Sequence, residues 1–165
     1  MKMSGQFIDE LTREAQTTKR VLERVPQDKL SWKPHPKSWS LGQLALHVAQ
    51  VPGAIAELIT PLECAPPQFV QAEARSSAEL VKALDESVGK AKTKLAGWDD
   101  EALMSEWALR SGSQTIMKVP RVGMVRSIML NHWYHHRGQL VVYLRLLDVP
   151  VPSVYGPSAD ENPFA

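Results

Sequence analysis

Three of the five histidines fall in one short segment, and their spacing is typical of a metal site. The segment is Asn131–Gln139, in which His132 and His136 stand four residues apart with His135 beside them. In a helix, residues four apart lie one above the other, with Cβ atoms roughly 5–6 Å apart. Two imidazoles on one helical face can therefore bind a single divalent ion. Such a pair needs a further ligand from elsewhere in the chain.

The candidate for that further ligand is His47, on a helix predicted over residues 40–58. Ser40 begins this helix with Gln43 three residues later, which is a capping box. Apolar residues then recur every three or four positions, and His47 occupies one of these positions in the series Leu44, His47, Val51, Ile55 and Leu58. A histidine turned inward among leucine and valine is costly unless its nitrogens have partners.

His132 and His136 likewise replace inward apolar residues in the last predicted helix. For any one of these histidines alone, a core residue with ordinary hydrogen bonds is the better interpretation. Three inward histidines on two helices favour a metal, because one ion satisfies all of them through neutral imidazole nitrogens. His135 is displaced about 60° around the helix from His132 and flanks the same face. It stays an alternative to His136 as ligand, or a residue for acid–base work.

An open site of three histidines would suit catalysis better than a purely structural role. No cysteine, aspartate or glutamate close to the histidines in the sequence offers a fourth ligand. Structural zinc sites usually have four protein ligands, whereas catalytic sites keep one position for water or substrate. Such a site can lower the pKa of bound water or bind a thiolate or carbonyl. Imidazole ligands suit zinc, nickel, iron or copper, and the sequence does not choose among them.

These residues must be positioned by the helices of the fold. The sequence pattern predicts an all-α protein, a four-helix bundle with a small β-hairpin insertion between helices 3 and 4. Pro52-Gly53 predicts a kink in the second helix. The tail after residue 149 is expected to wrap the surface. The apolar periodicity predicts helices over residues 4–25, 40–58, 76–96 and 120–147, and alternation predicts the hairpin over residues 106–119.

Length and charge point to one soluble domain over residues 1–165. The net charge is +1 and no run of Lys or Arg occurs, which argues against a nucleic-acid partner. Neither a signal peptide nor a membrane span is evident, so we expect a cytoplasmic protein. The single cysteine, Cys64, has no activating base nearby and is interpreted as inert. Arg137 is interpreted as a surface cation, with an anionic substrate as the alternative, and Tyr155 and Asp160 as residues near the mouth of the site.

Two segments resemble the DinB/YfiT superfamily. Ser40-Leu-Gly-Gln-Leu-Ala-Leu-His47, after Lys-Pro-His-Pro-Lys-Ser-Trp, resembles the first ligand helix of that family. His132-x-x-His135-His136-Arg-Gly-Gln139 is similar to its second signature. The tail from Tyr143 onward is similar to one DinB branch, so the resemblance covers most of the chain.

The resemblance implies a four-helix bundle with one divalent ion, typically zinc or nickel, held by His47, His132 and His136. Members are often homodimeric and have been described as metal-dependent hydrolases, and characterised relatives include thiol-dependent transferases and isomerases. We therefore expect a metalloenzyme acting on a small molecule, as a transferase using a low-molecular-weight thiol or as a hydrolase. His135 and Gln139 would support the ligands or the chemistry. The alternatives are a non-enzymatic metal-binding or sensor protein and a metal-free structural bundle.

Overall fold

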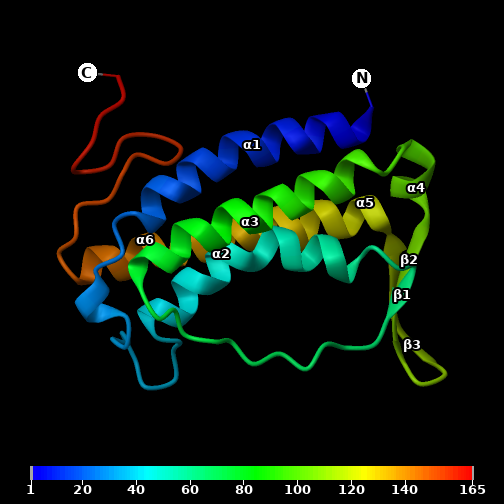
Figure 1. The fold of residues 1–165 in the computed structure, drawn as a ribbon, viewed down its shortest axis with the longest axis horizontal. Coiled ribbons are helices and arrows are strands. Elements are labelled where there is room, and N and C mark those ends of the chain that lie inside the picture. Colours follow the sequence, from blue (N-terminus) through cyan, green and yellow to red (C-terminus); the bar gives the residue numbers. More distant parts are fainter. Residues whose placement is uncertain (1, 165) are drawn as a thin grey trace.

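The computed structural model describes residues 2–164, and most of them are helical (Figure 1). Three long helices, α1 (Met3–Leu22), α2 (Leu41–Leu58) and α3 (Ser77–Ala96), run along the long axis of the molecule. A last helical run along the same axis comprises α5 (Arg121–Met124), η2 (Val125–Asn131) and α6 (His132–Leu146). Shorter helices are η1 (Gln27–Lys29) and α4 (Asp100–Met104).

A small sheet closes one end of the molecule (Figure 1). β2 (Glu106–Ser111) and β3 (Gln114–Pro120) pair antiparallel, and Gly112 supplies the positive φ of +56° that the turn requires. β1 (Glu63–Cys64) adds a third strand, parallel to β2. The prediction of a two-stranded hairpin was therefore incomplete. Two residues are too few to show the alternation by which a strand is recognised in a sequence.

α2 is the central helix and is buried on almost every side, including at Pro52 in its interior. Proline lacks the N–H that would bond to the carbonyl of Val48, four residues earlier. The indole Nε1 of Trp133 donates to that carbonyl at 2.7 Å. α2 therefore continues through Pro52, and the same hydrogen bond joins α2 to α6.

Gly53, the next residue, lies in close contact with α3. Its N–H donates to the hydroxyl of Ser87 at 2.8 Å, and that hydroxyl donates to the carbonyl of Gln50 at 3.0 Å. A Cβ at position 53 would lie 2.8 Å from the Ser87 carbonyl oxygen. Only glycine permits this approach without displacing α3.

The sequence predicted one continuous α-helix over residues 120–147. The last helical run differs from this prediction, because η2 is a π-helix. Its i→i+5 hydrogen bonds widen the turns and change the angular spacing of the side chains. The fully buried side chains of α6 are Trp133, Arg137, Leu140 and Leu144. His132 and His136, each one residue earlier, are only half-buried. The helix face that carries His132 and His136, which the sequence predicted to point into the core, therefore lies beside the core rather than in it.

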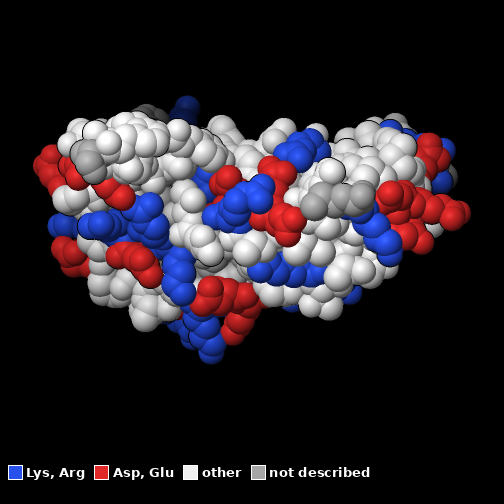
Figure 2. All heavy atoms as spheres, turned by 90° about the horizontal axis from the view of Figure 1, so that it is seen from above, with Lys and Arg blue, Asp and Glu red and all other residues white. Residues whose placement is uncertain are grey.

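The tail after α6 folds against the end of α1 and against α6 (Figure 1). Glu161 pairs with Arg20, and Asp160 pairs with Arg145 and accepts from the N–H of Val151 at 2.9 Å. On the face that Figure 2 shows, acidic and basic side chains of the described residues intermingle. Among residues 2–164, no helix is long and apolar enough to cross a membrane.

Candidate metal site

The three histidines predicted as ligands lie together, with their Nε2 atoms turned toward one another. The Nε2 of His132 lies 2.7 Å from that of His136 and 3.5 Å from that of His47. One ligand atom from each ring lies within 4.8 Å of the others. Two nitrogens bound tetrahedrally to one zinc ion stand roughly 3.4 Å apart. Small side-chain movements would therefore bring all three rings onto one ion.

The other nitrogen of each ring, Nδ1, contacts a carbonyl oxygen. A carbonyl oxygen only accepts hydrogen bonds, so each Nδ1 carries the proton and each Nε2 keeps a free lone pair. Oriented in this way, an imidazole can bind a metal through Nε2 while Nδ1–H fixes the plane of the ring. The contacts are His47 to Gln71 Oε1 (3.0 Å), His132 to the Ile128 carbonyl (3.3 Å), and His136 to Gln139 Oε1 (2.7 Å).

Two lone pairs that face each other across 2.7 Å repel unless a cation lies between them. Protonation of the rings is disfavoured. Burial, followed by the neighbouring His136, lowers the pKa of His47 to about 4. Burial also lowers the pKa values of His132 and His136 below the usual range for histidine. The rings are thus neutral at pH 7, which is the form that binds a metal ion.

The helix of His47 begins as predicted, and its cap also supports the site. Ser40 accepts from the N–H of Gln43 at 3.1 Å, and the Gln43 side chain accepts from the N–H of Ser40 at 3.0 Å. This arrangement confirms the capping box. The amide nitrogen of Gln43 also donates to the backbone carbonyl of Gln71 at 3.1 Å. The start of α2 therefore holds the segment that carries the partner of His47.

Gln71 is a site residue that the sequence did not indicate. It lies in the connection of residues 59–76, where no periodic pattern marks a position as inward. Its side-chain nitrogen donates to the carbonyl of Ala72 at 3.0 Å, which leaves Oε1 directed at His47. A glutamine on a proline-rich connection offers no sequence signal for such a role.

Aromatic side chains form one wall of the site. The Trp39 ring stacks on His136, with centroids 5.9 Å apart, and meets His47 edge-on at 5.0 Å. Phe69 meets His47 edge-on at 5.5 Å. Trp39 thus joins the loop before α2 to the candidate ligands themselves. These rings shield the Nε2 cluster from water on that side.

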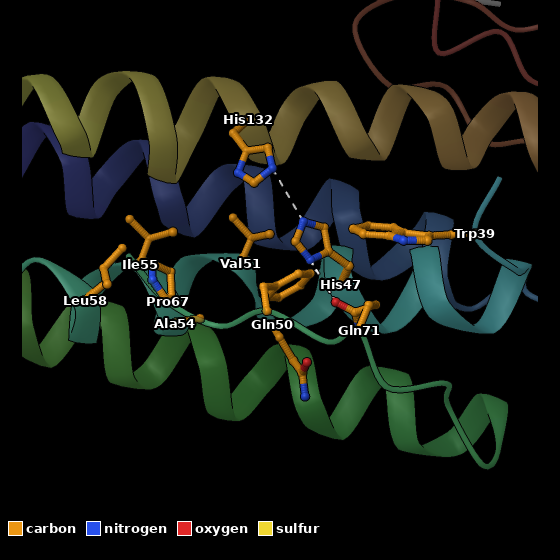
Figure 3. Close-up of a pocket in the computed structure, with 11 residues that line it drawn as sticks. Trp39, His47, Gln50, Val51, Ala54, Ile55, Leu58, Pro67, Gln71 and His132 are labelled. Carbon is orange, nitrogen blue, oxygen red and sulfur yellow. Dashed lines mark hydrogen bonds between the residues drawn. The ribbon is translucent and has the colours of Figure 1, made fainter. Parts of the chain in front are cut away.

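A cavity of about 370 Å³ opens beside the histidines (Figure 3). His47, His132 and Trp39 form one end of it, and Figure 3 shows Val51, Ile55 and Leu58 extending away from them along α2. The full lining comprises Trp39, His47, Gln50, Val51, Ala54, Ile55, Leu58, Pro67, Phe69, Gln71 and His132. A ligand in this cavity would have direct access to two of the three candidate metal ligands.

The remaining sequence candidates lie at the edge of the site or outside it. Gln139 contacts His136, as described above, whereas His135 is exposed and its ring centroid lies 5.0 Å from that of His136. His35 is exposed and accepts from the N–H of Lys37 at 3.1 Å. Burial raises the pKa of the Cys64 thiol, which favours its unreactive protonated form.

The interpretation of Arg137 as a surface cation was wrong, because its side chain is 2% exposed. It pairs with Glu14 at 2.6 Å, donates to the hydroxyl of Thr18 at 3.1 Å, and donates to the hydroxyl of Tyr155 at 2.6 Å. We call Arg137, Glu14, Thr18 and Tyr155 the arginine cluster. Because Tyr155 belongs to it and Asp160 pairs with Arg145, neither tail residue lines the mouth of the histidine site, contrary to expectation.

Comparison with known proteins gives one consistent result. The model of the DinB family matches residues 1–163. The uncharacterised protein YrdA of Bacillus subtilis is 25% identical over 152 residues, covering 90% of this chain and 85% of that protein. A DinB-like protein from Bacillus cereus superposes with a TM-score of 0.71 at 24% identity, covering 93% of this chain and 98% of the other. The DinB-like protein YjoA of Bacillus subtilis superposes with a TM-score of 0.70 at 22% identity, covering 90% of this chain and 96% of the other.

Proposed function

This chain belongs to the DinB family, and on that premise we propose that it is a metal-dependent enzyme whose single divalent ion is bound by His47, His132 and His136. We take the four long helical runs as the four-helix bundle of the family, with the hairpin between the third and fourth. We also take residues 1–165 as one domain. The proposed partners are a small-molecule substrate and a second copy of the chain in a cytoplasmic homodimer.

One observation carries the proposal. Three Nε2 atoms converge, and each Nδ1 contacts a carbonyl oxygen. A histidine cluster of purely structural origin would instead pair donors with acceptors, because buried polar groups are generally satisfied. Here three acceptors are directed at a common point, which suits a cation.

Three protein ligands leave a coordination position open for water or substrate. A zinc or nickel ion supplies Lewis acidity there, lowering the pKa of a bound water or thiol. The two candidate reactions, thiol transfer and hydrolysis, both need this property. We favour thiol transfer on family resemblance.

The surrounding side chains orient the ligands and restrict solvent. Gln71 and Gln139 hold the rings of His47 and His136 through their Nδ1 atoms. Trp39 covers the cluster on one side. His135, exposed beside His136, is placed to pass a proton between the site and solvent.

Metal titration tests the binding site. Freshly purified protein is stripped with a chelator and titrated with Zn²⁺ and Ni²⁺ by calorimetry, beside the variants H132A and H35A. We expect one ion per chain in the wild type and in H35A, which removes an exposed histidine that does not belong to the cluster, and loss of binding in H132A. Equal binding by H132A, or no binding by the wild type, would overturn the site.

Turnover is tested separately from binding. A panel of electrophiles with low-molecular-weight thiols, and a panel of esters and amides, is screened with the zinc-loaded and the chelated protein. We expect activity that requires the ion and is lost in H47A. If metal binds and raises the thermal stability but no reaction in either panel depends on it, the chain is a metal-binding or sensor protein.

A further inference from the structure

Resting on the proposed metal site, we propose that its substrate is an uncharged molecule with an alkyl or aryl body and one metal-binding head. The head would occupy the open position at the histidines. The body would fill the cavity along α2 (Figure 3). The shape, lining and orientation of that cavity support this assignment.

The cavity has the size and shape of a site for a small organic ligand. Its volume of about 370 Å³ lies within the range typical of such pockets, roughly 300–1,000 Å³. Val51, Ile55 and Leu58 recur on one face of α2. At about 1.5 Å of rise per residue, the strip from Val51 to Leu58 is roughly 10 Å long. An extended apolar chain or a ring system fits along it.

The lining offers little to a charged ligand. Apart from His47 and His132, no ionisable side chain of the described residues lines the cavity, and its polar members are Gln50 and Gln71. Gln71 is already bonded to His47 and Ala72. Figure 3 shows Gln50 pointing away from the histidines. A charged group deep in this cavity would lose its hydration without gaining a partner, which is strongly unfavourable.

A second cavity nearby shows what a site for a polar ligand looks like in this protein. It measures about 290 Å³, contacts His136 and shares Trp39 with the apolar cavity. Its lining is more polar and comprises Lys37, Ser38, Trp39, Leu44, His136, Gln139 and Tyr143. It does not reach His47 or His132. The apolar cavity is the one that reaches two of the three candidate metal-binding histidines, His47 and His132.

The roof of the apolar cavity comes from the segment that also orients a metal ligand. Pro67 and Phe69 line the cavity, and Gln71, two residues further on, accepts from His47. Phe69 also packs against His47 and Trp39. An apolar body in the cavity would therefore press on the same segment that fixes His47.

Binding of a homologous series of ligands tests the inference. The probes are n-alkyl hydroxamic acids with tails of two to eight carbons, which are uncharged in neutral solution and bind a metal through the deprotonated head, titrated into the zinc-loaded protein by calorimetry. We expect affinity to rise about fourfold for each added methylene until the cavity is full. A matched set of hydroxamic acids that carry a carboxylate at the far end of the tail should bind at least tenfold more weakly at equal tail length. Affinity independent of tail length, or tighter binding of the carboxylates, would overturn the assignment.

A variant that narrows the cavity shows where the tail lies. Ala54 lines the cavity without contacting a histidine, so A54L should end the rise in affinity at a shorter tail. A78L, at an exposed position on α3 outside the lining, is the matched control and should leave the series unchanged. An A54L series identical to the wild type would place the tail elsewhere and refute the inference.

Repeating the series with chelated protein separates this inference from the metal proposal. If zinc does not bind but affinity still rises with tail length, the metal site fails and the apolar ligand stands. If zinc binds and tail length has no effect, the metal site stands and the apolar ligand fails.

Discussion

Two consecutive residues of α6, His136 and Arg137, belong to two polar clusters of opposite character. In the arginine cluster the guanidinium finds a carboxylate, Glu14, and two hydroxyls within the chain. In the histidine cluster the Nε2 atoms face one another, and no carboxylate of residues 2–164 belongs to the group. The first cluster is complete as folded, whereas the second has acceptors without a donor.

This difference separates a structural polar cluster from a binding site. A buried charge is tolerated when paired and hydrogen-bonded, and the arginine cluster thereby joins α1, α6 and the tail. Acceptors that converge without a donor are unfavourable in the empty protein and favourable once a cation binds. Burial of polar groups alone therefore does not indicate a binding site. A group of buried acceptors that lacks a donor within the chain does indicate one.

Breaking the arginine cluster should have the largest effect on stability. In R137M, Glu14 loses its guanidinium partner, keeps only the Tyr155 hydroxyl as a donor and stays largely buried, so we expect the free energy of unfolding in urea to fall by about 3–5 kcal/mol. R145M removes an exposed ion pair to Asp160, which solvent screens, and should cost much less stability than R137M. Similar losses in the two variants would show that the arginine cluster is no more than a surface contact.

Lowering the pH should destabilise the metal-free protein through the histidine cluster. The pKa of His47 is about 4 in the folded protein and about 6.5 when unfolded, so the unfolded state binds more protons between these values. Stability is then fully present above about pH 6.5 and falls by up to about 3 kcal/mol as the pH approaches 4. Urea denaturation at each pH, compared between wild type and H47L, isolates this contribution. Parallel pH profiles for the two proteins would contradict it.

Removing a partner of a ligand should weaken metal binding. In Q71L, His47 loses the acceptor that holds its ring, and we expect zinc affinity to fall about 10–100-fold. Q50L lines the same cavity without contacting a histidine and serves as the control. An unchanged affinity in Q71L would mean that the ring of His47 is positioned by packing alone.

Strengthening α6 without touching either cluster should give the smallest effect. A Cβ at Gly138 would meet nothing within 4 Å, and glycine inside a helix is less favourable than alanine by about 1 kcal/mol. We expect G138A to raise the free energy of unfolding by about 0.5–1 kcal/mol and to leave zinc affinity unchanged. G53A, in which the Cβ would clash with Ser87, should instead lower stability by about 1–3 kcal/mol. Destabilisation by G138A would indicate an unrecognised contact at this face.

Much of the helical framework could be predicted, because local signals define it. The capping box of Ser40 marked the start of α2, and the apolar periodicity located all four long helical runs within a few residues. The DinB resemblance is confirmed by the family match. β1 and the π-helix η2 were missed, since a two-residue strand and a change of helical pitch leave no periodic pattern.

By itself, the sequence indicated that His47 and His132 share a site with either His136 or His135, since the spacing within the last helix and the place of His47 in an apolar series are local, periodic properties. The tertiary structure brings His136 rather than His135 together with the other two. Only the tertiary structure decided that Gln71 orients His47, that Trp39 covers the cluster, and that an apolar cavity opens beside it. It also decided that Arg137 is buried against Glu14 rather than exposed. These features depend on contacts between distant segments and on the register after a π-helix, and residue spacing within one helix carries no information about either.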